Sequence, residues 1–290
     1  LVCNAEQLDL VRDFLSSHFK QIRDIDLSAS ANGKNENWFL PIAGTVDKSD
    51  IFAGSVLSDL TQVFTGVYDG NDYKIENWSY VPQAEDDKVA VGFFVANAGT
   101  IKNLEFSSFS LTGYAFVGGL VALNAGSIDH VTVSGSLADV SYSGSIMINI
   151  GFGPMAMLPF VAALGVAFEA GSISHFNVTG SVNMPNTDVV AGAIGWLSDA
   201  SQPISESEIH VSNATISAHG GVAGIASFGL LSNAADRTTI SVHDSSISNS
   251  TLTAVGATQV LVPPSAGGGF EVSLEEGFLR ETLQSLARTQ

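Results

Sequence analysis

NAGTIKNLEF occupies residues 97–106, and two later stretches repeat its pattern: NAGSIDHVTV at residues 124–133 and EAGSISHFNV at residues 169–178. The second copy starts 27 residues after the first (97 to 124), and the third starts 45 residues after the second (124 to 169). A short run of small apolar residues precedes each copy. A pattern that recurs in this way indicates one structural unit repeated along the chain.

Each unit reads as a short strand, a tight glycine turn and a second, alternating strand. Units in constant register are expected to stack edge to edge, about 4.8 Å apart, with an apolar column on each inner face. We therefore predict an all-β fold, a right-handed parallel β-helix (solenoid) with short capping helices at both ends. The predicted first column is Ile101, Ile128, Ile173, Ile209 and Ile240, and the second is Leu104, Val131 and Phe176.

The chain has 290 residues, with 29 acidic and 11 basic side chains and a net charge of -18. Lys102 and Arg237 are the only permanent cations between residues 91 and 270. Such a surface has few groups that could replace the counterions of a polyanion, so nucleic acid is not expected as a partner. Stacking explains the scarcity of charge, since a charge repeated in every coil would lie beside its like-charged copy.

Helical patterns occur at the two ends of the chain. Asn4 followed by Gln7 resembles a capping pair before an apolar stripe, and SLEE at residues 273–276 resembles a capping box. We predict an N-terminal capping helix in residues 1–20, a parallel β-helix in residues 21–270 and a C-terminal capping or linker helix in residues 271–290. Because position 1 is Leu, the segment has the look of an excised piece or a mature product.

The repeats, together with residues 2–77, resemble bacterial surface and secreted proteins that carry the GLUG motif. The resemblance covers roughly residues 2–250, and its most specific part is FTGVYDGNDYKI at residues 64–75. The sequence departs from the pattern in two ways: Asp72 stands where a second Gly is usual, and His130 and His175 stand where Asn is usual. The resemblance implies a β-helical stalk or adhesive module, and such repeats also occur beside immunoglobulin A peptidase domains.

Enzymatic activity is not expected from the residues present. A polysaccharide lyase of this shape needs a cation near the anionic sugar, and the coils hold only Lys102 and Arg237. Hydrolysis needs two carboxylates across a groove, and the closest dense pair, Asp69 and Asp72, lies in a sequence typical of a turn. We predict no catalytic residue, no cofactor and no metal site.

His130 and His175 occupy equivalent positions in the second and third copies, so they could stack in neighbouring coils. A metal ion usually requires a third and a fourth ligand. Because Asn103 holds the same position in the first copy, the pattern favours a polar ladder beside a turn over a metal site.

An apolar insertion explains why the third copy comes late. The spacing of 45 exceeds 27 by 18, which places an inserted loop near residues 141–160, and three of the four methionines lie in it. Two prolines, Pro154 and Pro159, argue against a membrane-spanning helix over this apolar stretch. Such a loop is either packed over a flank or exposed for a partner. The candidate partner-binding residues are Met147, Phe152, Met155, Met157 and Phe160.

Two functions remain open from the sequence. The first is a non-enzymatic module that acts in adhesion or as a stalk, through loops at residues 31–62 and 141–160. Its partner would be a protein or glycan ligand on a host or neighbouring cell, or a second copy of the chain, and its location would be extracellular or on the bacterial cell surface. The second is a carbohydrate-active or carbohydrate-binding β-helix, which a row of exposed aromatic residues (Trp38, Trp78, Tyr68, Tyr73) would favour.

Overall fold

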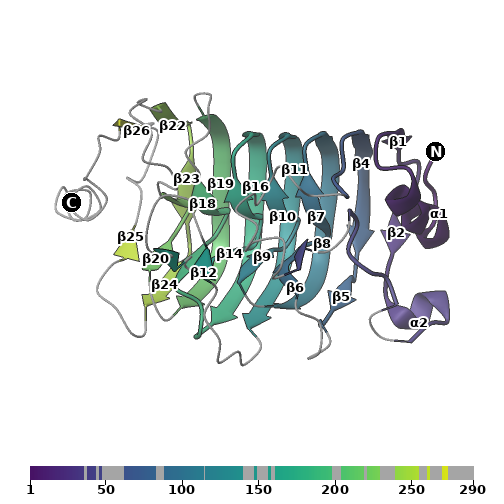
Figure 1. The fold of residues 1–290 in the computed structure, drawn as a ribbon, viewed down its shortest axis with the longest axis horizontal. Helices are drawn as coiled ribbons and strands as arrows, with labels where there is room; N and C mark the ends of the chain where they lie inside the picture. Colours follow the sequence, from purple (N-terminus) through teal and green to yellow (C-terminus); the bar gives the residue numbers. More distant parts are fainter. Residues whose placement is uncertain are drawn as a thin grey trace.

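The repeats form long strands that lie side by side in one sheet (Figure 1). All pair in parallel and in chain order: β4 (Val67–Glu76), β8 (Thr100–Gly113), β11 (Ser127–Asp139), β16 (Ser172–Met184), β19 (Ile204–Ala218) and β22 (Thr239–His243). In this computed structural model the described residues are 1–35, 38–43, 46–47, 62–82, 88–113, 115–139, 147–148, 156–157, 161–197, 204–218, 221–228, 239–254, 260–261 and 270–273.

Two further sheets are built from shorter strands of the same repeat units. Each unit, which we call a coil, contributes one strand to the long sheet and shorter strands to the other two. One sheet contains β7 (Phe94–Asn97), β10 (Val121–Asn124), β15 (Val166–Glu169), β18 (Ile194–Leu197) and β21 (Ala226–Phe228). The other contains β3 (Val46–Asp47), β6 (Lys88–Val91), β9 (Phe116–Gly118), β14 (Val161–Ala163), β17 (Val189–Ala191), β20 (Gly221–Ala223) and β25 (Val260–Leu261). Apart from the antiparallel pair of β3 and β6, both sheets are parallel, so the predicted all-β, parallel architecture is confirmed.

The N-terminal segment contains short helices and strands. They are α1 (Ala5–Asp9), the 3₁₀ helix η1 (Leu10–Asp13), β1 (His18–Lys20), β2 (Ile25–Asp26) and α2 (Ala29–Asn32). The predicted capping pair is observed, because the Asn4 side chain accepts a hydrogen bond from the Gln7 amide while Gln7 Oε1 accepts one from the Cys3 amide. Since β1 and β2 both pair with β4, the N-terminal segment is joined to the first coil by backbone hydrogen bonds.

Short elements also border the long sheet. β5 (Ser79–Tyr80) pairs with β8, while β23 (Ser246–Ser248) and β24 (Thr251–Ala254) pair with β19. The predicted C-terminal helix over residues 271–290 is wrong for its first three residues, which belong to strand β26 (Phe270–Ser273) on the antiparallel edge of β22. The rest of that segment lies outside the described residues. No described helix is long and apolar enough to cross a membrane.

The apolar columns form as predicted in the first coils and shift in the later ones. Ile101, Ile128 and Ile173 are paired across β8, β11 and β16, and all three are buried. Ile209, however, pairs with Phe176 and so belongs to the second column. Ile240 was also misplaced, since it pairs with Ile204. The register of β16 and β19 puts Glu206 opposite Ile173, and an acidic residue at an apolar position hid the true alignment.

A left-handed bend recurs at one equivalent position in five successive coils, where φ is near +50°: Asn103, His130, His175, Glu208 and Asp244. Some coils hold a second residue with such a φ, for example Ser108 in β8 and Asn213 in β19. Asn and Asp tolerate this conformation better than other residues with a side chain. The bend explains why Asn is usual in this position, and it changes the direction of the side chains around it.

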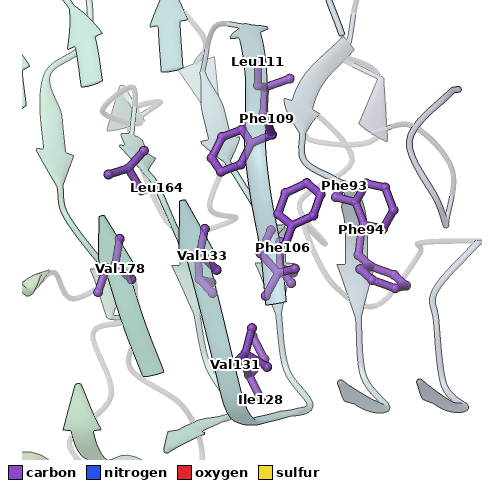
Figure 2. Packing of buried hydrophobic residues seen from close by; sticks show 14 of the residues in the cluster. Phe93, Phe94, Phe106, Phe109, Leu111, Ile128, Val131, Val133, Leu164 and Val178 are labelled. Atoms are coloured by element: carbon purple, nitrogen blue, oxygen red, sulfur yellow. The ribbon is translucent and has the colours of Figure 1, made fainter. Parts of the chain in front are cut away.

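Aromatic rings fill the core of the first coils (Figure 2). The ring of Phe106 lies 4.7 Å from that of Phe93 and 5.0 Å from that of Phe109, measured between centroids. Trp78 contacts Phe93 edge to face at 5.3 Å. All four side chains are buried, so these coils are held together by ring packing as well as by backbone pairing.

Glycine is required at the turn before β8, β11 and β16. A Cβ atom on Gly126 would lie against the carbonyl oxygen of Gly99, and one on Gly171 would lie against that of Gly126. We expect Gly126→Ala to lower the free energy of unfolding by about 1 to 3 kcal/mol, because the coils would have to move apart. Urea denaturation measures the free energy of unfolding of the variant and of the wild type. The neighbouring Ala125→Ser is the control, since Ala125 is exposed, and an equal loss in both variants would contradict the explanation.

Candidate functional site

Asp129 and His130 meet on the outer surface because of the left-handed bend. In a regular strand, neighbouring side chains point to opposite faces. His130 has φ +52°, which breaks that alternation, and its Nδ1 lies 2.9 Å from Oδ2 of Asp129. Two adjacent residues of β11 therefore present a carboxylate and an imidazole to the same side of the sheet.

The next coil adds His175 to the same carboxylate. β16 pairs with β11 so that Ser174 lies beside Asp129. Nδ1 of His175 is 2.9 Å from Oδ1 of Asp129, and the Ser174 hydroxyl donates a hydrogen bond of 2.7 Å to that oxygen. The two imidazole rings stack with their centroids 3.9 Å apart, so the two histidines do form the predicted ladder.

A third coil contributes Glu208, which holds His175 from the other side. Its Oε2 lies 3.1 Å from Nε2 of His175. The resulting order of contacts is His130, Asp129, His175 and Glu208, and it spans β11, β16 and β19. The four side chains are 37 to 54% exposed, so solvent and small ions reach the group.

The carboxylate of Asp129 is held in its ionised form. Partial burial opposes ionisation, but hydrogen bonds from Ser174, His130 and His175 outweigh it and lower the pKa of Asp129 to about 2. A permanent negative charge therefore lies between two imidazole nitrogens. One ligand atom from each of Asp129, His130 and His175 lies within 4.8 Å of the other two, which is close enough for one ion to contact all three.

The sequence predicted the stacked histidines but missed Asp129 and Glu208. Asp129 precedes His130 in the chain, so in a regular strand it would face the other way. One signal for the bend was available in the sequence. Asn is usual at the position of His130, and Asn favours a left-handed backbone conformation. Glu208 was missed because the register of β19 was misassigned by three residues.

A second polar group lies inside the coils, at the corner that leads into the long sheet. The Asn97 amide donates a hydrogen bond of 2.6 Å to Oδ1 of Asn124, and the Asn124 amide donates to both oxygens of Glu169. Glu206 lies nearby, with one oxygen accepting a hydrogen bond from the Ile173 amide. Its other oxygen, Oε1, has no hydrogen-bond partner among the described residues.

Burial raises the pKa of both glutamates at this corner. Desolvation is the main cause at Glu169, where it raises the pKa to about 8 although hydrogen bonds from Asn124 and the Gly171 and Ala170 amides oppose it. At Glu206, desolvation and the nearby charge of Glu169 raise the pKa well above its usual value. The raised pKa values favour retention of a proton by this pair of carboxyl groups at neutral pH.

The predicted partner-binding loop contains a short hairpin. β12 (Met147–Ile148) and β13 (Ala156–Met157) pair antiparallel, with Met147 opposite Met157. Phe152, Met155 and Phe160 lie outside the described residues. The hairpin breaks the coil pattern between β11 and β14, at the place where the spacing of the repeats predicted an insertion.

Two of the four aromatic residues considered for a sugar-binding row belong to the core. Tyr68 and Trp78 are buried, and their polar atoms bond to Gln21 and to the carbonyl of Phe39. Trp38 is half-buried and donates to the Leu27 carbonyl, while Tyr73 is half-buried. Tyr68 and Trp78 therefore cannot stack on a sugar at the surface.

The acidic pair of the FTGVYDGNDYKI turn has a structural role. Oδ1 of Asp69 accepts hydrogen bonds from the Asn71 amide and the Asn103 side chain, while Lys102 Nζ lies 3.9 Å from Oδ2. Asp72 has φ +63° and is exposed. Both aspartates lie inside strand β4, whose register with β8 shifts between Asp69 and Tyr73. The predicted turn is therefore a local irregularity within a strand, held by hydrogen bonds typical of a turn.

Comparison with known proteins gives partial similarities. The chain is 32% identical over 121 residues (40% of this chain, 1% of that protein) to halomucin of Haloquadratum walsbyi. It is 27% identical over 138 residues (46% of this chain, 14% of that protein) to a "Putative Gly-rich membrane protein" of Evansella cellulosilytica. The structure of an IgA1 protease aligns with a TM-score of 0.48 and 15% identity, over 99% of this chain and 24% of that one. No family model matches the chain.

Proposed function

We propose that this chain is a non-enzymatic module of a secreted or cell-surface protein, folded as a right-handed parallel β-helix and acting as a stalk or in adhesion. The observation that carries the proposal is the stack of coils, in which β8, β11, β16 and β19 follow one another in parallel register. A stack of this kind extends in one direction, so it can hold a binding surface at a distance from an attachment point.

The outer face of the long sheet suits contacts with proteins or glycans. Every exposed residue of β16 is Ser or Asn: Ser172, Asn177, Ser181 and Asn183. These side chains offer hydrogen-bond donors and acceptors without a net charge. They also avoid the repulsion that stacked ionic residues would produce between coils.

The location that we propose is extracellular or on the cell surface. The GLUG-like repeats and the name of one relative, a "Putative Gly-rich membrane protein", support it. Because the chain spans 1% and 14% of the two curated relatives it matches, it corresponds to a small part of each. A module that is joined to further domains in a longer protein would match such a small share of each relative.

The proposed contacts are made by the loops that break the coil spacing, at residues 31–62 and 141–160. The second contains the β12–β13 hairpin and five apolar residues singled out from the sequence: Met147, Phe152, Met155, Met157 and Phe160. An apolar loop on a polar stack favours association with a protein partner or a second copy of the chain.

We expect deletion of residues 142–159 to abolish self-association while leaving the fold intact. The deletion removes 18 residues, so the third copy would again follow the second at a spacing of 27 (45 minus 18), as the second follows the first. Sedimentation velocity over a range of concentrations measures association, and thermal unfolding reports the fold. An equal sedimentation coefficient for the two proteins at every concentration would remove the loop from the proposal.

A reducing-sugar assay on a panel of polysaccharides tests the non-enzymatic part of the proposal. We expect no turnover by the full chain, and a glycan array probed with the same protein separates binding from cleavage. Turnover of any polysaccharide would replace the proposal with the carbohydrate-active alternative, for which Tyr68 and Trp78 are unsuitably placed.

A further inference from the structure

We propose that Asp129, His130 and His175 form a Zn²⁺ site on the outer face of the long sheet, with Glu208 holding His175 in place. The three ligand atoms are Nδ1 of His130, Nδ1 of His175 and a carboxylate oxygen of Asp129. They come from two adjacent coils, so the site exists only when β11 and β16 are paired. The site is independent of the apolar loop used in the proposed function.

The distances between the ligand atoms are close to those that Zn²⁺ requires. Each imidazole Nδ1 lies 2.9 Å from an oxygen of Asp129. In a tetrahedral site with bonds of about 2.0 to 2.1 Å, ligand atoms lie about 3.3 Å apart. Small rotations of exposed side chains would therefore admit the ion, which would replace the contacts now made directly between Asp129 and the histidines.

The types of ligand select the metal. Two imidazoles and one carboxylate suit Zn²⁺ and neighbouring borderline ions, whereas Ca²⁺ and Mg²⁺ prefer six or more oxygen ligands. The chain between residues 91 and 270 holds ten acids and two bases, and this excess of negative charge favours a cation on its surface. Three protein ligands leave one position of a tetrahedral ion open to solvent.

Glu208 supplies the support that zinc-binding histidines usually have. With Nδ1 bound to the ion, Nε2 of His175 carries a hydrogen and donates it to Oε2 of Glu208, 3.1 Å away. Such a carboxylate fixes the tautomer and the orientation of the ring and makes the imidazole a better ligand. Glu208 is a positioning residue and does not touch the ion.

The test is isothermal titration calorimetry of the full chain with ZnCl₂ alone. The same titration is then made with the His130→Asn variant and with the His175→Asn variant. Asn103 occupies the equivalent position, so Asn is compatible with the left-handed bend and the fold should persist, as circular dichroism will verify. We expect each variant to lose at least about 100-fold in affinity, and Glu208→Gln to lose about 10-fold. His210→Asn is the matched control, because His210 bonds to Ser246 outside the group, and its affinity should equal that of the wild type.

A second readout identifies the ligand atoms. In nitrogen-15 correlation spectra, Zn²⁺ should shift the Nδ1 resonances of His130 and His175 and leave His210 unchanged, and CaCl₂ should produce no such shift. The proposal is overturned if the wild type fails to bind Zn²⁺ at millimolar concentration. It is also overturned if folded His130→Asn and His175→Asn variants bind as tightly as the wild type.

Discussion

Phe106→Ala is expected to lower the free energy of unfolding by about 3 to 5 kcal/mol. The Phe106 side chain is fully buried, and its ring packs against the rings of Phe93 and Phe109. In its column Phe106 stands between Ile75 of the preceding coil and Val133 of the following one, both smaller than Phe. Neither neighbour can fill the space that the ring would leave, so the variant should retain a cavity at the centre of the aromatic cluster.

Urea unfolding followed by tryptophan fluorescence measures the loss in free energy of unfolding and reports on the coils that contain the aromatic cluster. Trp78 lies 6.1 Å from Phe106 between ring centroids, so its emission reports the same coils. Phe106→Leu, which keeps most of the volume, should lose less than the alanine variant. Phe14→Ala is the matched control, because the Phe14 side chain is 57% exposed, and we expect a change within about 0.5 kcal/mol. Similar losses at Phe14 and Phe106 would show that the cluster does not hold the coils together.

The sequence predicted the stacking of the first coils because their repeats are strict. The NAG and EAG turns, the isoleucines at 101, 128 and 173 and the histidines at 130 and 175 all pair as the spacing implied. The prediction failed at β19, where Glu206 occupies the place of an isoleucine. Periodic patterns reveal positions that repeat, and a functional or buried polar residue at such a position breaks the pattern that would locate it.

The grouping of Asp129 with His130 on the outer face depends on a local backbone bend that the alternation of apolar residues does not encode. Alternation along a strand places Asp129 and His130 on opposite faces, and the bend at φ +52° puts them together. Glu208 lies in the group because of the register of β19. That register could not be aligned from the repeat pattern, because Glu206 occupies a position that is apolar in the preceding coils. The contacts that Asp129 and Glu208 make between coils could therefore be identified only in the structure.

The stability of the protein is expected to fall as the pH rises from about 5 to about 8. Burial raises the pKa of Glu169 to about 8, whereas an unfolded glutamate titrates near 4.5. Between these values the folded state holds a proton that the unfolded state has released, so the free energy of unfolding decreases with pH. One retained proton corresponds to about 1.4 kcal/mol per pH unit. The lowered pKa of Asp129 acts in a separate, acidic window, since its stabilising contribution is lost only as the pH falls towards about 2.

Glu206→Gln should flatten this dependence and raise stability at pH 8. The amide cannot ionise, so the variant loses one of the two buried groups whose raised pKa makes stability fall with pH. The Glu169 carboxylate keeps the hydrogen bonds that it accepts from the Asn124 side chain and the Gly171 amide. Urea denaturation at several pH values between 5 and 8 gives the slope for each protein. Glu105→Gln is the control, because Glu105 lies at the surface beside Lys74, and the slope of that variant should match the wild type. A wild-type stability that rises from pH 5 to pH 8 would mean that the two buried carboxyl groups are ionised in the folded state, with a cation or water molecules at the corner that they share.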